Sequence, residues 1–260
     1  GAAFGLGFMF GPLIGGLLAN YSYMVAGFGS AGFSFMAFLF AFFLLPETIT
    51  EKKSLINFQY KILDIEYVKS TLRHPAVGLL IILFFIIVFS MANIYGTFSI
   101  LGYRVYNFTD QENGYLFGII GIVSTLMQGG FIRMLSEKFE DRNLVLSGSI
   151  FMMFGLGFLP YGINFWGVAL VVSVLSIGTG ILQPTILSMI SKYSPEKEQG
   201  GILGLNQSFS AFARVLGPLW GGFAFDVIGY QYPFLTGAVF TFITFLIGFF
   251  LLNTKRLQEN

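Results

Sequence analysis

The sequence has no cysteine, a single histidine and few charged residues, which make up 10% of its 260 residues. Without cysteine, disulfides and zinc-thiolate sites are excluded. A water-soluble domain carries about 25% charged residues, so this chain lacks the polar surface that water requires. The 14 Lys and Arg nearly balance the 13 Asp and Glu, which excludes the basic surface that nucleic-acid binding needs. With 55% hydrophobic residues, the chain is predicted to have the lipid bilayer as its solvent.

Catalytic sets are missing as well. No pair of carboxylates falls inside a long apolar stretch, and there is neither a thiol nor a second imidazole. Nucleophilic, metal and acid-base chemistry therefore lack their usual groups. We predict a protein that is not an enzyme and that holds no cofactor and no metal.

What the sequence does contain is long charge-free runs. A membrane-spanning helix needs about 20 apolar residues, so the runs 1–46 and 143–191 are each long enough for two helices, and four shorter runs hold one each. Because the apolar residues are continuous rather than alternating, helices are favoured over barrel strands. We predict an all-α membrane protein, a helical bundle with eight transmembrane helices. The predicted spans are 2–19, 24–45, 76–101, 113–134, 144–161, 165–190, 200–225 and 232–252.

The cationic residues predict the orientation. Twelve of the 14 Lys and Arg fall in the intervals that follow the second, fourth, sixth and eighth predicted helices. Since cytoplasmic loops are enriched in Lys and Arg, these intervals and both chain termini are predicted to be cytoplasmic. The polar stretch 47–75 carries charges of both signs and is predicted to be a cytoplasmic linker.

Two segments carry signals for helix starts. Thr109 and Glu112 have the spacing of a capping box before the fourth predicted helix. Ser194 and Pro195 are predicted to supply the N-cap and the first-turn proline of the seventh.

One motif occurs twice. The segment 11–16 (GPLIGG) matches 217–222 (GPLWGG) at an offset of 206 residues, six predicted helices apart. Many secondary transporters are built from repeated bundles with the substrate path between them. We therefore interpret 1–46 as the last two helices of an N-terminal six-helix bundle, and 76–260 as a C-terminal six-helix bundle with a short tail. On this interpretation four helices precede the chain, and a start inside a span is expected.

Small residues and proline give the repeated element its predicted structural role. Glycines spaced four apart leave a groove into which a neighbouring helix fits, and proline removes a backbone donor and bends the helix. The residues concerned are Gly7, Gly11, Pro12, Gly15 and Gly16 in the first copy, and Gly217, Pro218, Gly221 and Gly222 in the second.

At these residues the chain resembles a known family. The pattern from Gly7 to Gly16 is similar to the antiporter motif gxxxGPxxGG in the fifth helix of drug:proton antiporters of the major facilitator superfamily. The segments 1–7, 46–48 and 199–201 resemble tetracycline-efflux-like members. The resemblance implies helices five to twelve of a twelve-helix bundle in the bacterial inner membrane, which exports a small amphipathic compound or drug in exchange for protons.

Two features depart from that family pattern. The loop 133–142 has Arg133 and Glu140 where the family motif has glycine. The segment 144–161 lacks the acidic residue that some tetracycline pumps carry in their ninth helix, with Met152 near its place.

Polar groups inside predicted spans are candidate site residues, because a charge at a helix centre costs about 2.5–3.5 kcal/mol on insertion scales. Arg214 is the one charged residue deep in a predicted span, and Gln207 and Ser210 share its helix face, with Asn206 beside them. The resemblance implies a cavity lined by helices seven, eight, ten and eleven. It adds the substrate-binding candidates Asn93, Tyr95, Gln128 and Gln183, the last before Pro184, where a broken turn would free a carbonyl.

Structural interpretations of these residues stay open. Asn93 and Gln128 are equally suited to hydrogen bonds between helices, and Arg214 to a carboxylate outside the chain or to an extended position reaching the membrane interface. Phe98, Phe209 and Phe212 are alternative lining groups for an apolar substrate.

The first functional hypothesis is a proton-coupled exporter in which Arg214 binds an anionic substrate group or shifts the pKa of a distant carboxylate. Its partners are a small-molecule substrate, protons and the bilayer, with no nucleic acid. The alternatives are a facilitator or symporter of a small metabolite, and a non-transporting scaffold or receptor. The scaffold predicts that Gln207, Ser210 and Arg214 are packed dry.

Overall fold

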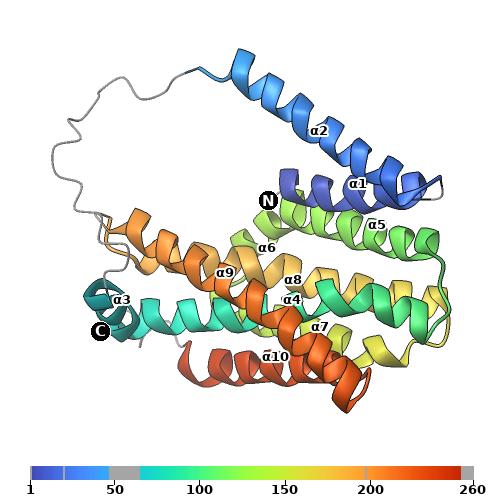
Figure 1. Ribbon diagram of the computed structural model, residues 1–260. Helices are drawn as coiled ribbons and strands as arrows, with labels where there is room; N and C mark the ends of the chain where they lie inside the picture. Colours follow the sequence, from blue (N-terminus) through green and yellow to red (C-terminus); the bar gives the residue numbers. More distant parts are fainter. Residues whose placement is uncertain (1, 20, 47–64, 197, 253–260) are drawn as a thin grey trace.

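A computed structural model describes residues 2–19, 21–46, 65–196 and 198–252, and every regular element in these ranges is a helix (Figure 1). The protein is therefore all-α, as predicted. The long helices are α1 (Ala2–Ala19), α2 (Tyr23–Leu44), α4 (Pro75–Arg104), α5 (Asp110–Leu126), α7 (Asp141–Phe158), α8 (Phe165–Tyr193), α9 (Gln199–Phe223) and α10 (Tyr232–Leu251). The short elements are α3 (Ile65–Arg73), the π-helical turn η1 (Met127–Phe131), α6 (Ile132–Lys138), the 3-10 turn η2 (Leu159–Tyr161) and the π-helical turn η3 (Ala224–Ile228).

Seven helical stretches of the described chain are long and apolar enough to cross a membrane. They match seven of the eight predicted spans; α1 is not among them. The crossing of α1 stays a prediction, as do the orientation and the cytoplasmic termini.

Four of the long helices start at a capping side chain: Ser22 for α2, His74 for α4, Thr109 for α5 and Asn164 for α8. No side chain caps the starts of α7, α9 and α10. The capping box of Thr109 and Glu112 is present as predicted. The prediction for Ser194 was wrong: α8 runs through Tyr193, and the Ser194 hydroxyl donates back to the Ile190 carbonyl of that helix. The serine therefore ends α8, and α9 begins at Gln199, four residues after the position that an N-cap at Ser194 requires.

The predicted linker 47–75 falls partly outside the described residues, which resume at position 65. Its last part forms α3, which packs against the start of α4. The division into two bundles and a linker stays a prediction.

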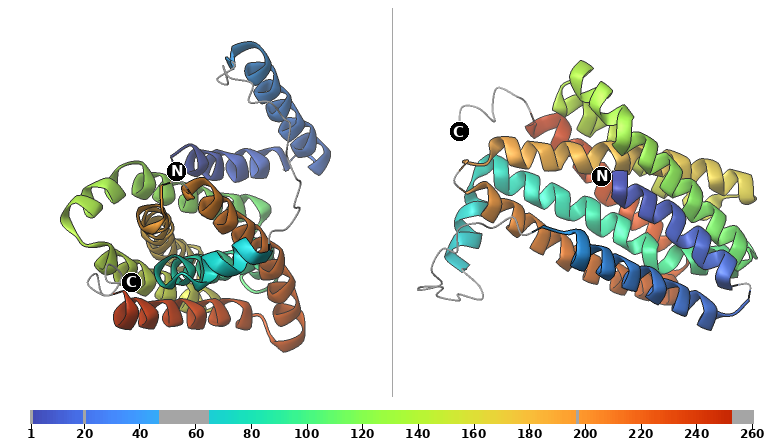
Figure 2. Two further views of the ribbon diagram at one scale, coloured as in Figure 1. Left: turned by 90° about the vertical axis from the view of Figure 1, so that its left-hand side faces the viewer. Right: turned by 90° about the horizontal axis from the view of Figure 1, so that it is seen from above.

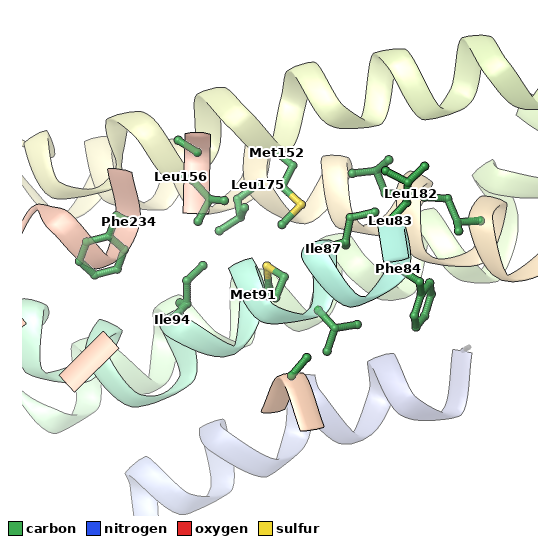
Figure 3. Close-up of a cluster of buried hydrophobic side chains, with 14 of the residues drawn as sticks. Leu83, Phe84, Ile87, Met91, Ile94, Met152, Leu156, Leu175, Leu182 and Phe234 are labelled. Atoms are coloured by element: carbon green, nitrogen blue, oxygen red, sulfur yellow. The ribbon is translucent and has the colours of Figure 1, made fainter. Parts of the chain in front are cut away.

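The core lies where α4, α7, α8 and α10 meet. Figure 3 shows side chains from all four pointing toward one another, among them Ile87, Met152, Leu182 and Phe234. α7 and α8 approach so closely that a Cβ built on Gly155 would lie 2.6 Å from the Leu175 Cα. Only glycine permits this close approach of α7 and α8.

One tyrosine joins two connecting segments of this block. The Tyr106 hydroxyl, just after α4, donates to the Leu159 carbonyl at 2.8 Å and accepts from the Gly162 N–H at 2.9 Å. It thereby ties the end of α4 to the turn between α7 and α8.

α1 and α2 stand differently. α1 lies along α5 (Figure 1), whereas α2 is extended away from the block and has no buried residue (Figure 2). The Tyr23 hydroxyl donates to the Asp110 carboxylate at 2.8 Å and so links the start of α2 to the start of α5.

Candidate functional site

The second copy of the repeated motif forms the contact between α9 and α4. A Cβ built on Gly217 would lie 2.5 Å from the Ala92 Cβ, and one on Gly221 would lie 3.1 Å from the Asn93 Oδ1. Any side chain at these positions would therefore push the two helices apart. α9 continues through Pro218 without a break.

The first copy has other surroundings. A Cβ built on Gly7, Gly11 or Gly15 would meet no described atom within 4 Å. A Cβ on Gly16 would lie 3.5 Å from the Asp110 carbonyl oxygen of α5, whereas its counterpart Gly222 has nothing within 4 Å. α1 is continuous through position 12, and the Pro12 side chain is outside the described part.

Three of the predicted site residues are buried. Asn93 is fully buried (0% exposed) and Asn206 nearly so (1%), and neither amide has a hydrogen-bond partner in the described structure. Ser210 is also buried, and its hydroxyl donates to the Asn206 carbonyl at 2.8 Å. Because these groups are covered, they are not accessible to a substrate in this conformation.

Three others are exposed. Tyr95 (43% exposed), Gln207 and Arg214 reach the surface of α4 and α9. Tyr95 and Arg214 are close enough to interact electrostatically. They lie beside the point where a Cβ on Gly96 would approach the Pro218 Cβ at 3.4 Å. The structure thus brings Tyr95 and Arg214 together, with Gln207 about two turns earlier on the same face of α9.

The two remaining candidates are half-buried. Gln128 lies in η1 and Gln183 on α8, and neither side chain bonds to another described residue. α8 continues as a helix through Pro184, so the predicted broken turn is absent.

The π-helical turn η1 was not predicted from the sequence. It interrupts the span 110–138 at Met127–Phe131, and residues on either side line a hollow of about 430 Å³. π-Helical turns are rare and frequent at functional sites. The adjacent glycines Gly129 and Gly130 were the available signal, because glycine weakens an α-helix.

The aromatic candidates separate in space. Phe98 is in the core, 1% exposed, with its ring centroid 5.3 Å from that of Phe117, so it lines no pocket. Phe209 and Phe212 gather around Phe85 instead. At about 100° per residue, Phe212 lies on the side of α9 opposite Arg214.

Two ion pairs join different helices near their ends. Arg104 bonds to Asp226 at 3.1 Å, and Lys192 to Asp141 at 3.3 Å. Within the described ranges no three His, Cys, Asp or Glu side chains form a group that could hold a metal ion.

Comparison with known proteins places this arrangement in a family. The chain is 25% identical over 242 residues to "Multidrug resistance protein 2" of Bacillus subtilis, which covers 90% of this chain and 58% of that protein. It is 26% identical over 275 residues to "Major facilitator superfamily domain-containing protein 10" of Homo sapiens, covering 97% and 58%. With "Quinolone resistance protein NorA" of Staphylococcus aureus it shares 24% over 222 residues, covering 85% and 55%.

The chain thus spans less than two thirds of the length of these relatives. The family model named Major Facilitator Superfamily matches residues 1–134 and 129–260, which together cover the whole chain. The chain therefore belongs to the Major Facilitator Superfamily.

Proposed function

We propose that the full-length protein is a secondary transporter that exports a small amphipathic compound or drug through the membrane. Membership of the family points to a transporter rather than an enzyme. Relatives named for multidrug and quinolone resistance support export of drug-like compounds. The observation that carries the proposal is the exposure of Gln207 and Arg214 on α9, within a helix apolar enough to cross a membrane.

This observation supports transport over the scaffold hypothesis. A scaffold has no use for a polar path and predicts dry packing of the stripe on α9. Ser210 is buried, but Gln207 and Arg214 are exposed. Because a charge in hydrocarbon is costly, exposed polar groups at this depth favour a water-filled path.

The arrangement of the protein is proposed to follow the repeat. In this proposal, α1 and α2 are helices five and six of twelve, 47–75 is the cytoplasmic linker, and 76–260 forms the C-terminal bundle. Both termini of the chain then face the cytoplasm of a bacterial cell. Transport occurs by rocking one bundle against the other. Within the superfamily, the protein is proposed to belong to the drug:proton antiporter group, which includes tetracycline-efflux-like proteins.

Proton exchange is the proposed driving reaction, and facilitated transport is the second candidate. The spans of this chain have no Asp or Glu in their interior. A proton-coupling carboxylate would therefore have to come from the part of the protein outside this chain, and without one the protein is a facilitator.

Proteoliposomes containing the full-length protein test these alternatives. Norfloxacin and ethidium are loaded, a pH gradient is imposed, and their movement is followed with and without nigericin to abolish the gradient. The proton exchanger predicts movement that nigericin stops. Movement that nigericin leaves unchanged identifies a facilitator, and no movement of any compound contradicts transport.

Rocking is tested by joining the two predicted bundles. A Cβ on Gly16 of α1 would lie 3.6 Å from the Gly114 Cα of α5, which suits a disulfide. We expect the double variant Gly16→Cys and Gly114→Cys to stop transporting when oxidised and to recover on reduction. The single variants under the same oxidant are the control. Full transport in the crosslinked protein would exclude movement between α1 and α5.

A further inference from the structure

Helix α9 has one buried face and two exposed strips that differ in composition. The buried face, against α4, consists of small and polar residues and one isoleucine. At about 100° per residue, the next strip contains Gly200, Gly204, Gln207, Ala211, Arg214, Pro218 and Gly222. The strip beyond it is largely apolar: Phe212, Val215, Leu219 and Phe223 are all exposed there. Its polar member, Ser208, donates its hydroxyl back to the Gly204 carbonyl of the same helix. The apolar strip suits lipid, so the strip with Arg214 is the side that faces a polar environment.

Arg214 is the distinguishing group of that strip. Its guanidinium forms no ion pair with any residue that the structure describes. The sequence has no Asp or Glu between positions 199 and 225, and none in the interior of the other predicted membrane spans. A permanent cation in a span needs a counter-charge or water, and this chain supplies no counter-charge.

Neighbouring groups complement a ligand that is part anion and part apolar. Tyr95, on α4, is close enough to Arg214 to interact with it and adds an aromatic ring with a hydroxyl. Gln207 adds amide donors on the same strip of α9. Space is available beside Gln207, because a Cβ on Gly204 would meet no described atom within 4 Å.

Resting on the transport function proposed above, we infer that Arg214 binds the anionic group of the transported compound. The substrate class is an amphipathic anion, a carboxylate or sulfonate on an aromatic body. The planar guanidinium donates two parallel hydrogen bonds to such a group, and Gln207 and Tyr95 flank it. Arg214 is thus the residue that determines specificity for charge.

Three probes with one naphthalene body test this assignment: 2-naphthalenesulfonate, 2-naphthalenesulfonamide and trimethyl(2-naphthyl)ammonium. Their initial rates are measured in proteoliposomes of the full-length protein. We expect the sulfonate to move at least about tenfold faster than the ammonium. Arg214→Gln should lower the sulfonate rate about tenfold or more, since the loss of a charge-assisted hydrogen bond weakens binding by that factor. The sulfonamide rate should stay within about twofold.

Two further variants serve as controls. Arg214→Lys keeps the charge without the planar fork and should retain part of the sulfonate rate. Arg104→Gln removes a cation that is already paired with Asp226 at the end of α4, and it should leave all three rates within about twofold. Yield and elution volume on gel filtration establish that each variant is folded.

Several results would overturn the assignment. A faster rate for the ammonium, or an unchanged sulfonate rate in Arg214→Gln, shows that Arg214 does not select anions. An equal loss for all three probes shows that Arg214 pairs with a carboxylate of the protein itself. If the sulfonate does not move while norfloxacin or ethidium does, transport stands and the anion assignment fails. If no compound moves at all, both fail.

Discussion

The two copies of the glycine-proline motif have the same sequence pattern and opposite surroundings. In α9, Gly217 and Gly221 are pressed against α4 while Gly222 is open; in α1, Gly16 lies against α5 while Gly11 and Gly15 are open. Each copy is thus covered on the side where the other is bare. If the two copies have equivalent surroundings, a helix equivalent to α4 would pack on Gly11 and Gly15 of α1. A helix equivalent to α5 would pack on Gly222 of α9.

This difference between the two copies indicates that the glycines of one motif contact two different neighbouring helices. The first and fifth positions of GPxxGG accept a neighbour of the same bundle, and the sixth accepts a helix across the predicted bundle boundary. This interpretation makes the glycines unequal, and substitutions can test it position by position in the full-length protein.

The largest effect is expected at the first position. Gly217→Leu would drive a side chain into Ala92, and overpacking of this kind costs about 1–3 kcal/mol or more. We expect a lower midpoint of thermal unfolding in detergent and a lower yield of folded protein.

Gly11→Leu is the matched variant in the first copy and tests whether that copy is also covered in the full-length protein. Within the described residues Gly11 has no close neighbour. If the two copies are equivalent, Gly11→Leu should be about as harmful as Gly217→Leu in the full-length protein. A Gly11→Leu protein with unchanged unfolding and transport would show that no helix covers the first copy.

A smaller effect is expected at the fifth and sixth positions. Gly221→Ala places a methyl group 3.1 Å from the Asn93 Oδ1 and 3.2 Å from the Thr97 Cγ2, tight contacts that should cost about 1–2 kcal/mol. Gly222→Ala meets nothing in this chain and should stay within about 0.5 kcal/mol. A cost for Gly222→Ala as large as for Gly221→Ala would reveal a helix packed on that side.

The smallest effects compare one substitution in the two regions. Tyr106→Phe loses the two hydrogen bonds that join the end of α4 to the turn between α7 and α8. It should lower the free energy of unfolding by about 1–2 kcal/mol. Tyr23→Phe loses one exposed hydrogen bond between α2 and α5 and should cost less than about 1 kcal/mol. Thermal unfolding of both variants checks the order, and an equal or larger cost for Tyr23→Phe would contradict it.

Alkaline pH gives Tyr106→Phe a second measurement. Burial raises the pKa of Tyr106, which lies after the end of α4, above its ordinary value. The folded state then keeps this proton at a pH where the unfolded chain loses it. Its contribution to stability is complete below about pH 10 and is lost as the pH rises through the folded pKa. Tyr106→Phe should remove that part of the alkaline destabilisation; an unchanged pH profile would contradict the assignment.

Much of the helical architecture was readable from the sequence, because charges mark the ends of apolar runs. α1 begins and ends as predicted, and α10 within one residue. The N-cap prediction for Ser194 failed because a serine between two helices can bond to the end of one or to the start of the next. Here its hydroxyl bonds to α8, the helix that it ends.

The candidate site was less predictable. Periodicity places Asn206, Ser210 and Arg214 on adjoining faces, but it cannot say which face a neighbouring helix covers. Tertiary contacts decide which face is covered. Here α4 packs against Gly217 and Gly221 of α9, so that Asn206 is covered and Arg214 stays exposed. The unpartnered amides of Asn93 and Asn206 likewise emerge only in three dimensions.

The π-helical turn at Met127–Phe131 has a consequence for how this protein tolerates changes of length. Such a turn bonds residue i to residue i+5 and so holds one residue more than an α-helical turn. Removing Gly129 would let the ladder close as a plain α-helix, with α5 and α6 keeping their faces. The same one-residue deletion in α8 would rotate all that follows by about 100° and turn its core residues outward.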